Sequence, residues 1–200
     1  FLAGTLRKLV EDGEDMTRWA QPLRESGLRK LEVSFAECKQ FDNAQAQLLA
    51  GALPDSLGAL DLMLGYSGVG VDGTRALFSA AARLPRLARL RFSSAKHGDA
   101  AAPELVRGLR QHDQMTSLEL SECRIGASGA REIAEYVRAS KTLKDLNLLN
   151  NKIGAEGAAA IGDALRANGA LTKVLAPSLW NLRSRSPAAA HACLVCRARS

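Results

Sequence analysis

A recurring spacing of apolar residues limits what this chain can fold into. The stretch TLKDLNL contains Leu143, Leu146 and Leu148 in the pattern L-x-x-L-x-L. Similar triplets, some with Met, Phe, Val or Ala in place of leucine, begin at positions 28, 57, 87, 115, 143 and 171, so the steps are 29, 30, 28, 28 and 28 residues. A period of about 20–50 residues is typical of stacked repeat units.

The second half of each unit repeats as well. Residues 125–129 and 153–157 both read Ile-Gly-x-x-Gly, and residues 69–73 read Val-Gly-x-x-Gly. His97-Gly98 stands in the same register, and Phe41 does so more loosely. Apolar residues follow eight and twelve positions later in five units. Because residues four apart share one face of a helix, this half of each unit predicts a helix.

Each unit therefore predicts a short strand, a loop and a returning helix. In x-L-x-L the side chains alternate, so the leucines face one side of the strand and the x residues face the other. A single unit cannot bury these apolar faces, whereas stacked units bury them between a parallel sheet and a row of helices. The chain is therefore predicted to be an α/β protein with an aliphatic core.

The units resemble leucine-rich repeats, L-x-x-L-x-L-x-x-(N/C)-x-(I/L), over about residues 28–176. Asn151 and Cys123 occupy the Asn/Cys position. The 28-residue length and the helix-rich second half resemble the ribonuclease-inhibitor-like subclass, as in NOD-like receptors, tropomodulins and Ran GTPase-activating proteins. The resemblance implies a leucine-rich-repeat solenoid: a curved right-handed βα superhelix with the parallel sheet on its concave face and the helices on its convex face.

The first three units depart from this pattern. The Asn/Cys position is Ala95 in the third unit, and backward alignment places it at Lys39 and Ser67 in the first two. The resemblance implies that this residue hydrogen-bonds backbone groups between turns, so these units must satisfy those groups differently. Units one and two are also longer between strand and helix, which predicts irregular loops at 34–40 and 63–68.

Three segments are expected. Residues 1–27 are an atypical N-terminal flank or partial repeat, in which Trp19 and Leu23 indicate a helix. Residues 28–176 form the repeat domain, with five full units and a sixth strand. Residues 177–200 are a C-terminal cap remnant and a flexible basic tail. The chain begins with Phe1, so the true N-terminus is expected to be missing.

Charge and cysteine usage limit the partners. The net charge is +6, but residues 177–200 hold four of the 27 basic residues and no acid, leaving 23 bases against 21 acids elsewhere. This balance argues against nucleic acid as a partner. No apolar run approaches the roughly 20 residues that cross a bilayer, so no membrane association is predicted. Cys38 and Cys123 are isolated, which favours a reducing, cytoplasmic compartment.

Several motifs suggest chemistry, but each has a simpler explanation. Residues 68–73 spell G-x-G-x-x-G between a predicted strand and helix, as in a dinucleotide site. Two of these glycines follow from the repeat, and no acid stands at the next strand end. His191-x-Cys193-x-x-Cys196 is half a zinc site at most. Cys123 falls at a buried repeat position. We therefore predict no catalytic, cofactor-binding or metal-binding residues, no small-molecule substrate and no cofactor.

Function is instead expected on the concave face of the sheet, where the x residues project. Its middle is predicted to be a basic band, Arg89 with Arg91, flanked by acids. An ordinary solvated sheet face is the alternative interpretation. The hypothesis is a non-enzymatic protein-interaction module, a scaffold or sensor fragment; a regulator of a small GTPase resembling Ran GTPase-activating proteins is the alternative. The predicted partner-binding residues are Lys30, Glu32, Asp61, Met63, Arg89, Arg91, Glu119, Asp145, Asn147 and Lys173.

Overall fold

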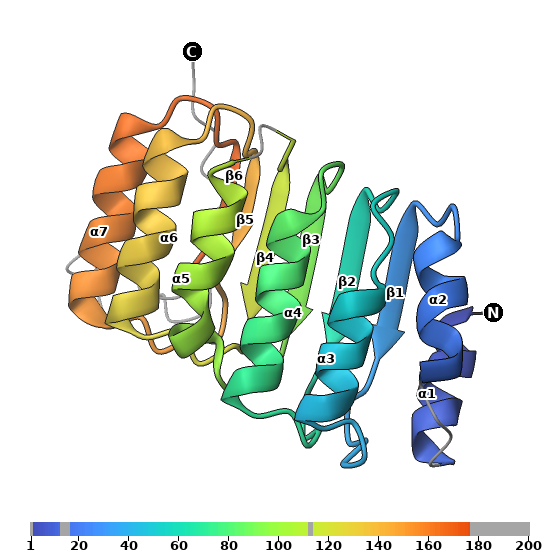
Figure 1. The fold of residues 1–200 in the computed structure, drawn as a ribbon. Helices are drawn as coiled ribbons and strands as arrows, with labels where there is room; N and C mark the ends of the chain where they lie inside the picture. Colours follow the sequence, from blue (N-terminus) through green and yellow to red (C-terminus); the bar gives the residue numbers. More distant parts are fainter. Residues whose placement is uncertain (1, 13–16, 112–113, 177–200) are drawn as a thin grey trace.

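The computed structural model describes residues 2–12, 17–111 and 114–176, and it shows one parallel sheet with a row of helices (Figure 1). The six strands follow one another in the order β1-β2-β3-β4-β5-β6. They are β1 Lys30–Ser34, β2 Ala59–Met63, β3 Arg89–Ser93, β4 Ser117–Ser121, β5 Asp145–Asn147 and β6 Lys173–Leu175. The helices are α1 Leu2–Glu11, α2 Thr17–Glu25, α3 Asn43–Ala52, α4 Val71–Arg83, α5 Gly98–Leu109, α6 Ala127–Ala139 and α7 Gly154–Ala167.

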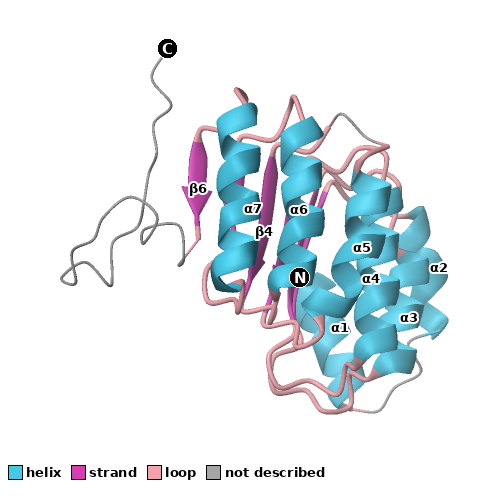
Figure 2. Ribbon diagram, turned by 90° about the vertical axis from the view of Figure 1, so that its left-hand side faces the viewer, coloured by secondary structure: helices cyan, strands magenta, loops and turns pink. Residues whose placement is uncertain are grey.

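All five inter-strand helices, α3 to α7, lie on one side of the sheet, as both ribbon views show (Figures 1 and 2). Burial alternates along the strands: in β1, Leu31 and Val33 are buried, whereas Lys30 and Glu32 are exposed. A strand that alternates in this way has one face in a core and one in solvent. The predicted α/β fold is confirmed: each of five units contributes one strand and one returning helix, and a sixth strand follows.

The repeat period sets the register of the sheet. Leu60 pairs with Leu90, and Leu90 with Leu118, so corresponding leucines of successive units lie side by side. Leu60, Leu90 and Leu118 are each about 1% exposed, which shows that the row is the centre of the core. Any other register would move apolar side chains to the solvated face, which makes the register strongly specified.

The N-terminal helices cover the first end of this core. Leu23, in the helix predicted around Trp19, is buried in α2, and α2 packs on α3. Leu6 and Val10 of α1 are also buried, which extends the core beyond the first repeat. The segment that was predicted to cap the other end, from Pro177 onwards, lies outside the described residues.

Within the described part of the chain, no helix is long and apolar enough to span a membrane.

Each of the strands β1 to β5 is followed by a sharp turn at a residue with positive φ. These residues are Glu37, Tyr66, Ser94, Glu122 and Asn150, with φ between 57° and 65°. The turns are linked between units, because the N–H of Ser94 donates to the Ser121 carbonyl and that of Glu122 to the Leu149 carbonyl. A left-handed residue at each turn redirects the chain from the sheet towards the helix layer.

The two longer loops have the irregular form that their length predicts, with one correction. Phe35 follows β1 and is fully buried, stacked on Phe41 with ring centroids 3.7 Å apart. The alignment that placed Lys39 at the Asn/Cys position is wrong, since Lys39 is exposed and Cys38 is buried. The inserted residues shift the alignment by one position, so the side chain of Cys38, rather than that of Lys39, points into the core. Ser67 is buried as aligned and donates to the Leu64 carbonyl at 2.8 Å.

Asn151 joins the fourth and fifth units through its side chain. Its amide nitrogen donates to the carbonyls of Leu120 and Leu148, at 2.6 and 2.9 Å. Its amide oxygen accepts from the N–H groups of Cys123 and Ile125, both at 3.0 Å. The bonds to the preceding unit confirm that this position satisfies backbone groups between turns. Cys123 repeats the role more weakly, with its thiol 3.4 Å from the Phe92 carbonyl.

Candidate functional site: the open face of the sheet

The open face is the set of strand side chains that point away from the helices. Strand register arranges them in three rows. The first row is Lys30, Ala59, Arg89, Ser117, Asp145 and Lys173; the second is Glu32, Asp61, Arg91, Glu119, Asn147 and Leu175; the third is Ser34, Met63, Ser93 and Ser121. All ten predicted partner-binding residues lie in these rows. Whether they bind a partner stays a prediction.

Arg91 is held between two carboxylates. Its guanidinium lies 3.4 Å from Asp61 on β2 and 3.1 Å from Glu119 on β4. The register places the three residues directly opposite one another, at the separation where opposite charges attract. Lys30 is likewise paired with Glu32, at 2.8 Å. The acids that were expected to flank Arg89 and Arg91 thus form ion pairs with Arg91 and offset its charge.

Arg89 differs from Arg91 in its surroundings. It is exposed, and its cross-strand neighbours are Ala59 and Ser117, neither of which is charged. In the part of the chain that the structure describes, no carboxylate forms an ion pair with Arg89. Its guanidinium is thus available to an external group, and the small neighbours leave room beside it.

Asp61 is the most enclosed of the acids on this face. Its side chain is 18% exposed, and its Oδ1 atom is buried without a hydrogen-bond partner. Burial raises the pKa of Asp61 above its ordinary value; the positive charge of Arg91 opposes this, and the charges of Glu32 and Glu119 add to it. For the exposed Glu32, the hydrogen bond and the charge of Lys30 lower the pKa.

An NMR titration is expected to separate these two acids. The midpoint for Asp61 should lie above 3.8 and that for Glu32 below 4.5. Folded Asp61 retains its proton to higher pH than unfolded Asp61. Its contribution to the free energy of unfolding therefore falls as pH rises from the pKa of unfolded Asp61 to that of folded Asp61. Arg91→Gln should raise the Asp61 midpoint further. A midpoint at or below 3.8 would contradict the proposed burial of this carboxylate.

The remaining predicted residues are Asp145, Lys173, Asn147 and Met63. Asp145 and Lys173 are exposed and stand opposite each other on β5 and β6. Asn147 is half-buried, and its side-chain oxygen accepts from the N–H of Leu149 at 3.0 Å, so it supports its own turn. Met63 is 39% exposed at the end of β2.

Tyr66 is an exposed aromatic residue that the repeat pattern did not indicate. It is 74% exposed in the turn after β2, close in sequence to Met63, and Lys96 lies 5.5 Å from its ring centroid. Tyr66 and Met63 are the large apolar residues that stand exposed in the described part of the chain. Tyr66 stands at the positive-φ turn position that Ser94, Glu122 and Asn150 occupy in later units, after the two inserted residues of the second unit. The sequence did hold one signal for Tyr66, since aromatic residues make up only 4% of the chain.

Comparison with known families agrees with this geometry. A family model described as Leucine Rich repeat matches residues 115–134 and 139–162. These segments span most of the fourth and fifth units, and the sheet register extends the same unit from β1 to β6. The fold is a leucine-rich-repeat solenoid. A search of curated proteins found no match to the chain.

The solenoid explains the G-x-G-x-x-G segment at residues 68–73 by a contact between units. The side-chain oxygen of Asn43 accepts from the N–H groups of Gly70 and Gly73, at 2.7 and 3.0 Å. These are the helix N-terminal groups that a phosphate would need. A Cβ on Gly73 would lie 2.7 Å from this oxygen, so the glycine makes room for Asn43.

The same arrangement recurs two units later. Oδ1 of Asp99, in the first turn of α5, accepts from the N–H groups of Gly126 and Gly129, at 2.8 and 2.7 Å. A carboxylate at a helix N-terminus satisfies orphan donors and opposes the positive end of the helix dipole. Neither cap is indicated by the local sequence pattern, because each joins residues 27 to 30 positions apart.

Cys123 is a structural residue of the solenoid. Its side chain is fully buried, and this burial raises the pKa of its thiol to about 12. The thiol therefore stays protonated at neutral pH, whereas the thiolate is the nucleophilic form. Cys193, Cys196 and His191 lie outside the described residues. Among the described residues, no group of three or more His, Cys, Asp or Glu side chains could hold a metal ion.

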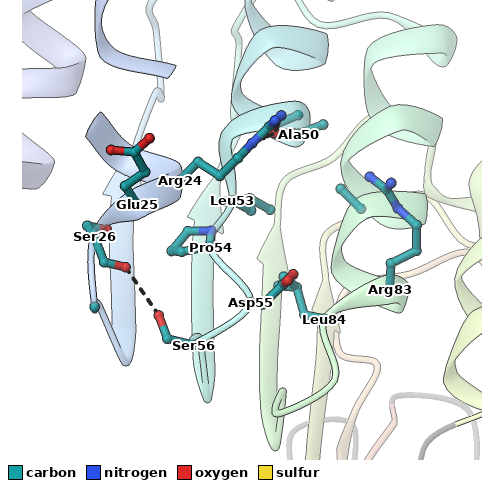
Figure 3. Close-up of a pocket in the computed structure, with 13 residues that line it drawn as sticks. Arg24, Glu25, Ser26, Ala50, Leu53, Pro54, Asp55, Ser56, Arg83 and Leu84 are labelled. Atoms are coloured by element: carbon teal, nitrogen blue, oxygen red, sulfur yellow. Dashed lines mark hydrogen bonds between the residues drawn. The ribbon is translucent and has the colours of Figure 1, made fainter. Parts of the chain in front are cut away.

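A hollow of about 640 Å³ lies where α2, α3 and α4 end (Figure 3). Its floor is apolar, with Leu53, Pro54 and Leu84, and Arg24 and Arg83 stand on two sides of it. Arg24 already donates to the Gly51 carbonyl, at 3.0 Å from Nε. The hydroxyl of Ser56 is also engaged, since it donates to the carbonyls of Leu28 and Ser26. These bonds join the N-terminal flank to the first two units, so the hollow is explained by the junction itself.

Proposed function

We propose that this leucine-rich-repeat chain is a non-enzymatic interaction module that binds a protein partner on its open face. The observation that supports this most is the face itself: charged side chains of both signs are displayed in register across six adjoining strands. Mixed charge of this kind selects a partner's orientation and speeds its association. Asp61 and Glu119, on either side of Arg91, disfavour a phosphate backbone.

The unit length and the α-helix in each second half support placing the chain in the ribonuclease-inhibitor-like subclass. We also propose a cytoplasmic location. The two described cysteines, Cys38 and Cys123, are free thiols, which suits a reducing compartment.

A charge exchange tests the proposed surface. In a pull-down with the full chain, Arg91→Glu with Glu119→Lys is expected to reduce retention of the partner at least about tenfold, or about 1.4 kcal/mol. The exchange keeps the net charge and an ion pair, but it reverses the pattern that the partner meets.

The matched control exchanges a pair on the helical face, Arg131→Glu with Glu156→Lys. This pair is also exposed and separated by 3.4 Å. The control should retain the partner as the wild type does, and circular dichroism should show both variants folded. Equal retention by both variants would place binding away from the open face. A retained small GTPase whose GTP hydrolysis the chain accelerates would favour the alternative function.

A further inference from the structure

We propose that the open face binds an extended segment of the partner that carries one acid, with its carboxylate over Arg89 and an apolar side chain, four residues away, over Met63, next to the turn that carries Tyr66. This inference rests on the proposed function and adds the chemistry of the segment. Two anchor points support it, and their separation sets the spacing.

The first anchor is the unpaired charge of Arg89. Lys30 and Arg91 are paired with acids of this chain, at 2.8 and 3.1–3.4 Å, whereas Arg89 has no such partner in the described structure. Its neighbours Ala59 and Ser117 are too short to cover it. A planar guanidinium with open sides can accept a carboxylate in the bidentate geometry that makes arginine pairs strong.

The second anchor is Met63, the last residue of β2, with Tyr66 three residues further on in the turn that follows. Met63 and Tyr66 are 39% and 74% exposed, and the register flanks Met63 with Ser34 and Ser93. Lys96 lies over the Tyr66 ring, which helps to hold the ring in place. An exposed Met side chain between small polar residues suits an apolar side chain of a partner, and the exposed Tyr66 follows it in the chain.

The distance between the anchors sets the spacing. Arg89 and Ser93 are the first and last residues of β3, and Met63 lies opposite Ser93 on β2. At about 3.3 Å per residue along a strand and about 4.8 Å between strands, the anchors are roughly 14 Å apart. An extended segment covers about that length in four residues.

The surrounding charges restrict the segment to a single acid at this site. Asp61 and Glu119 lie on the two neighbouring strands, two residues beyond the positions opposite Arg89. Asp145 lies two strands away in the same row as Arg89. A second negative charge would meet these acids and be repelled. The same repulsion opposes a nucleic acid, which carries a charge at every phosphate.

Peptide selection tests this inference with a defined probe. Random ten-residue peptides displayed on phage would be selected on the immobilised full chain. Enriched sequences should place Asp or Glu four residues from Leu, Met or an aromatic residue. For a synthetic copy of such a peptide, Arg89→Glu should weaken binding at least about tenfold in fluorescence anisotropy, about 1.4 kcal/mol. Replacing the peptide's acid with Lys should then restore affinity to Arg89→Glu.

Two further variants complete the design. Met63→Ala should weaken the peptide several-fold, whereas Arg131→Glu, on the helical face, should not change its affinity. Peptides that respond to the Arg91–Glu119 exchange but not to Arg89→Glu would overturn this inference and leave the proposed function standing. Selection of peptides without an acid, failure to select any peptide, or an oligonucleotide that competes at Arg89 would also overturn it. Partner retention in the pull-down, measured separately, decides the proposed function itself.

Discussion

Asn151→Ala is expected to lower the free energy of unfolding by about 3 kcal/mol. The side chain makes hydrogen bonds to the carbonyls of Leu120, Leu148 and Leu149 and to the N–H groups of Cys123 and Ile125. Alanine removes all of them and leaves backbone groups between two units without partners. The loss should exceed that of one hydrogen bond, because unsatisfied groups cost more than a bond contributes.

Urea denaturation, followed by circular dichroism, would measure this loss. Lys152→Ala is the control, since Lys152 is the next residue along the chain and is exposed. It should change the free energy of unfolding by less than about 0.5 kcal/mol. A loss below about 1 kcal/mol for Asn151→Ala would mean that water replaces the amide, and that the bonds seen between the units contribute little.

Gly129→Ala is expected to lower the free energy of unfolding by about 2 kcal/mol, against the usual preference of helices for alanine. A Cβ at this position would lie 2.6 Å from Oδ1 of Asp99 and 3.1 Å from the side chain of Ile125. It would therefore displace the carboxylate that accepts from Gly126 and Gly129. The substitution both crowds the junction between α5 and α6 and removes a helix cap.

A double-mutant cycle with Asp99→Ala separates these two effects. Once the carboxylate is gone, Gly129→Ala should cost less than about 1 kcal/mol, because the Cβ has lost its closest obstacle. Gly169→Ala is the matched control, since a Cβ there meets nothing within 4 Å, and it should be close to neutral. Additive losses in the cycle would show that the cap and the glycine act independently.

The predictions that succeeded depend on burial. The leucine triplets located all six strands, since each strand begins two residues after the first residue of its triplet, as Lys30 follows Leu28 and Arg89 follows Leu87. Alternation of side chains then determined which residues reach the open face, including all ten of the predicted partner-binding set. These features follow from local periodicity, because one face of every strand must be apolar to form the core.

What periodicity did not indicate depends on contacts between units. Arg89 and Arg91 were expected to be flanked by acids, but only the structure shows that Asp61 and Glu119 form ion pairs with Arg91. Lys39 was aligned with the Asn/Cys position, but the longer loop buries Cys38 instead.

The sequence by itself thus determined the repeat unit, the parallel sheet, the helical layer and the membership of the open face. Only the tertiary structure decided which charges on that face are offset, that Arg89 is not, and that Asn43 and Asp99 cap helices of the following units. The physical reason is one of range. Periodicity is set by neighbours within a strand or a helical turn, whereas these contacts join side chains 27 to 30 residues apart, and their distances exist only after the units have stacked.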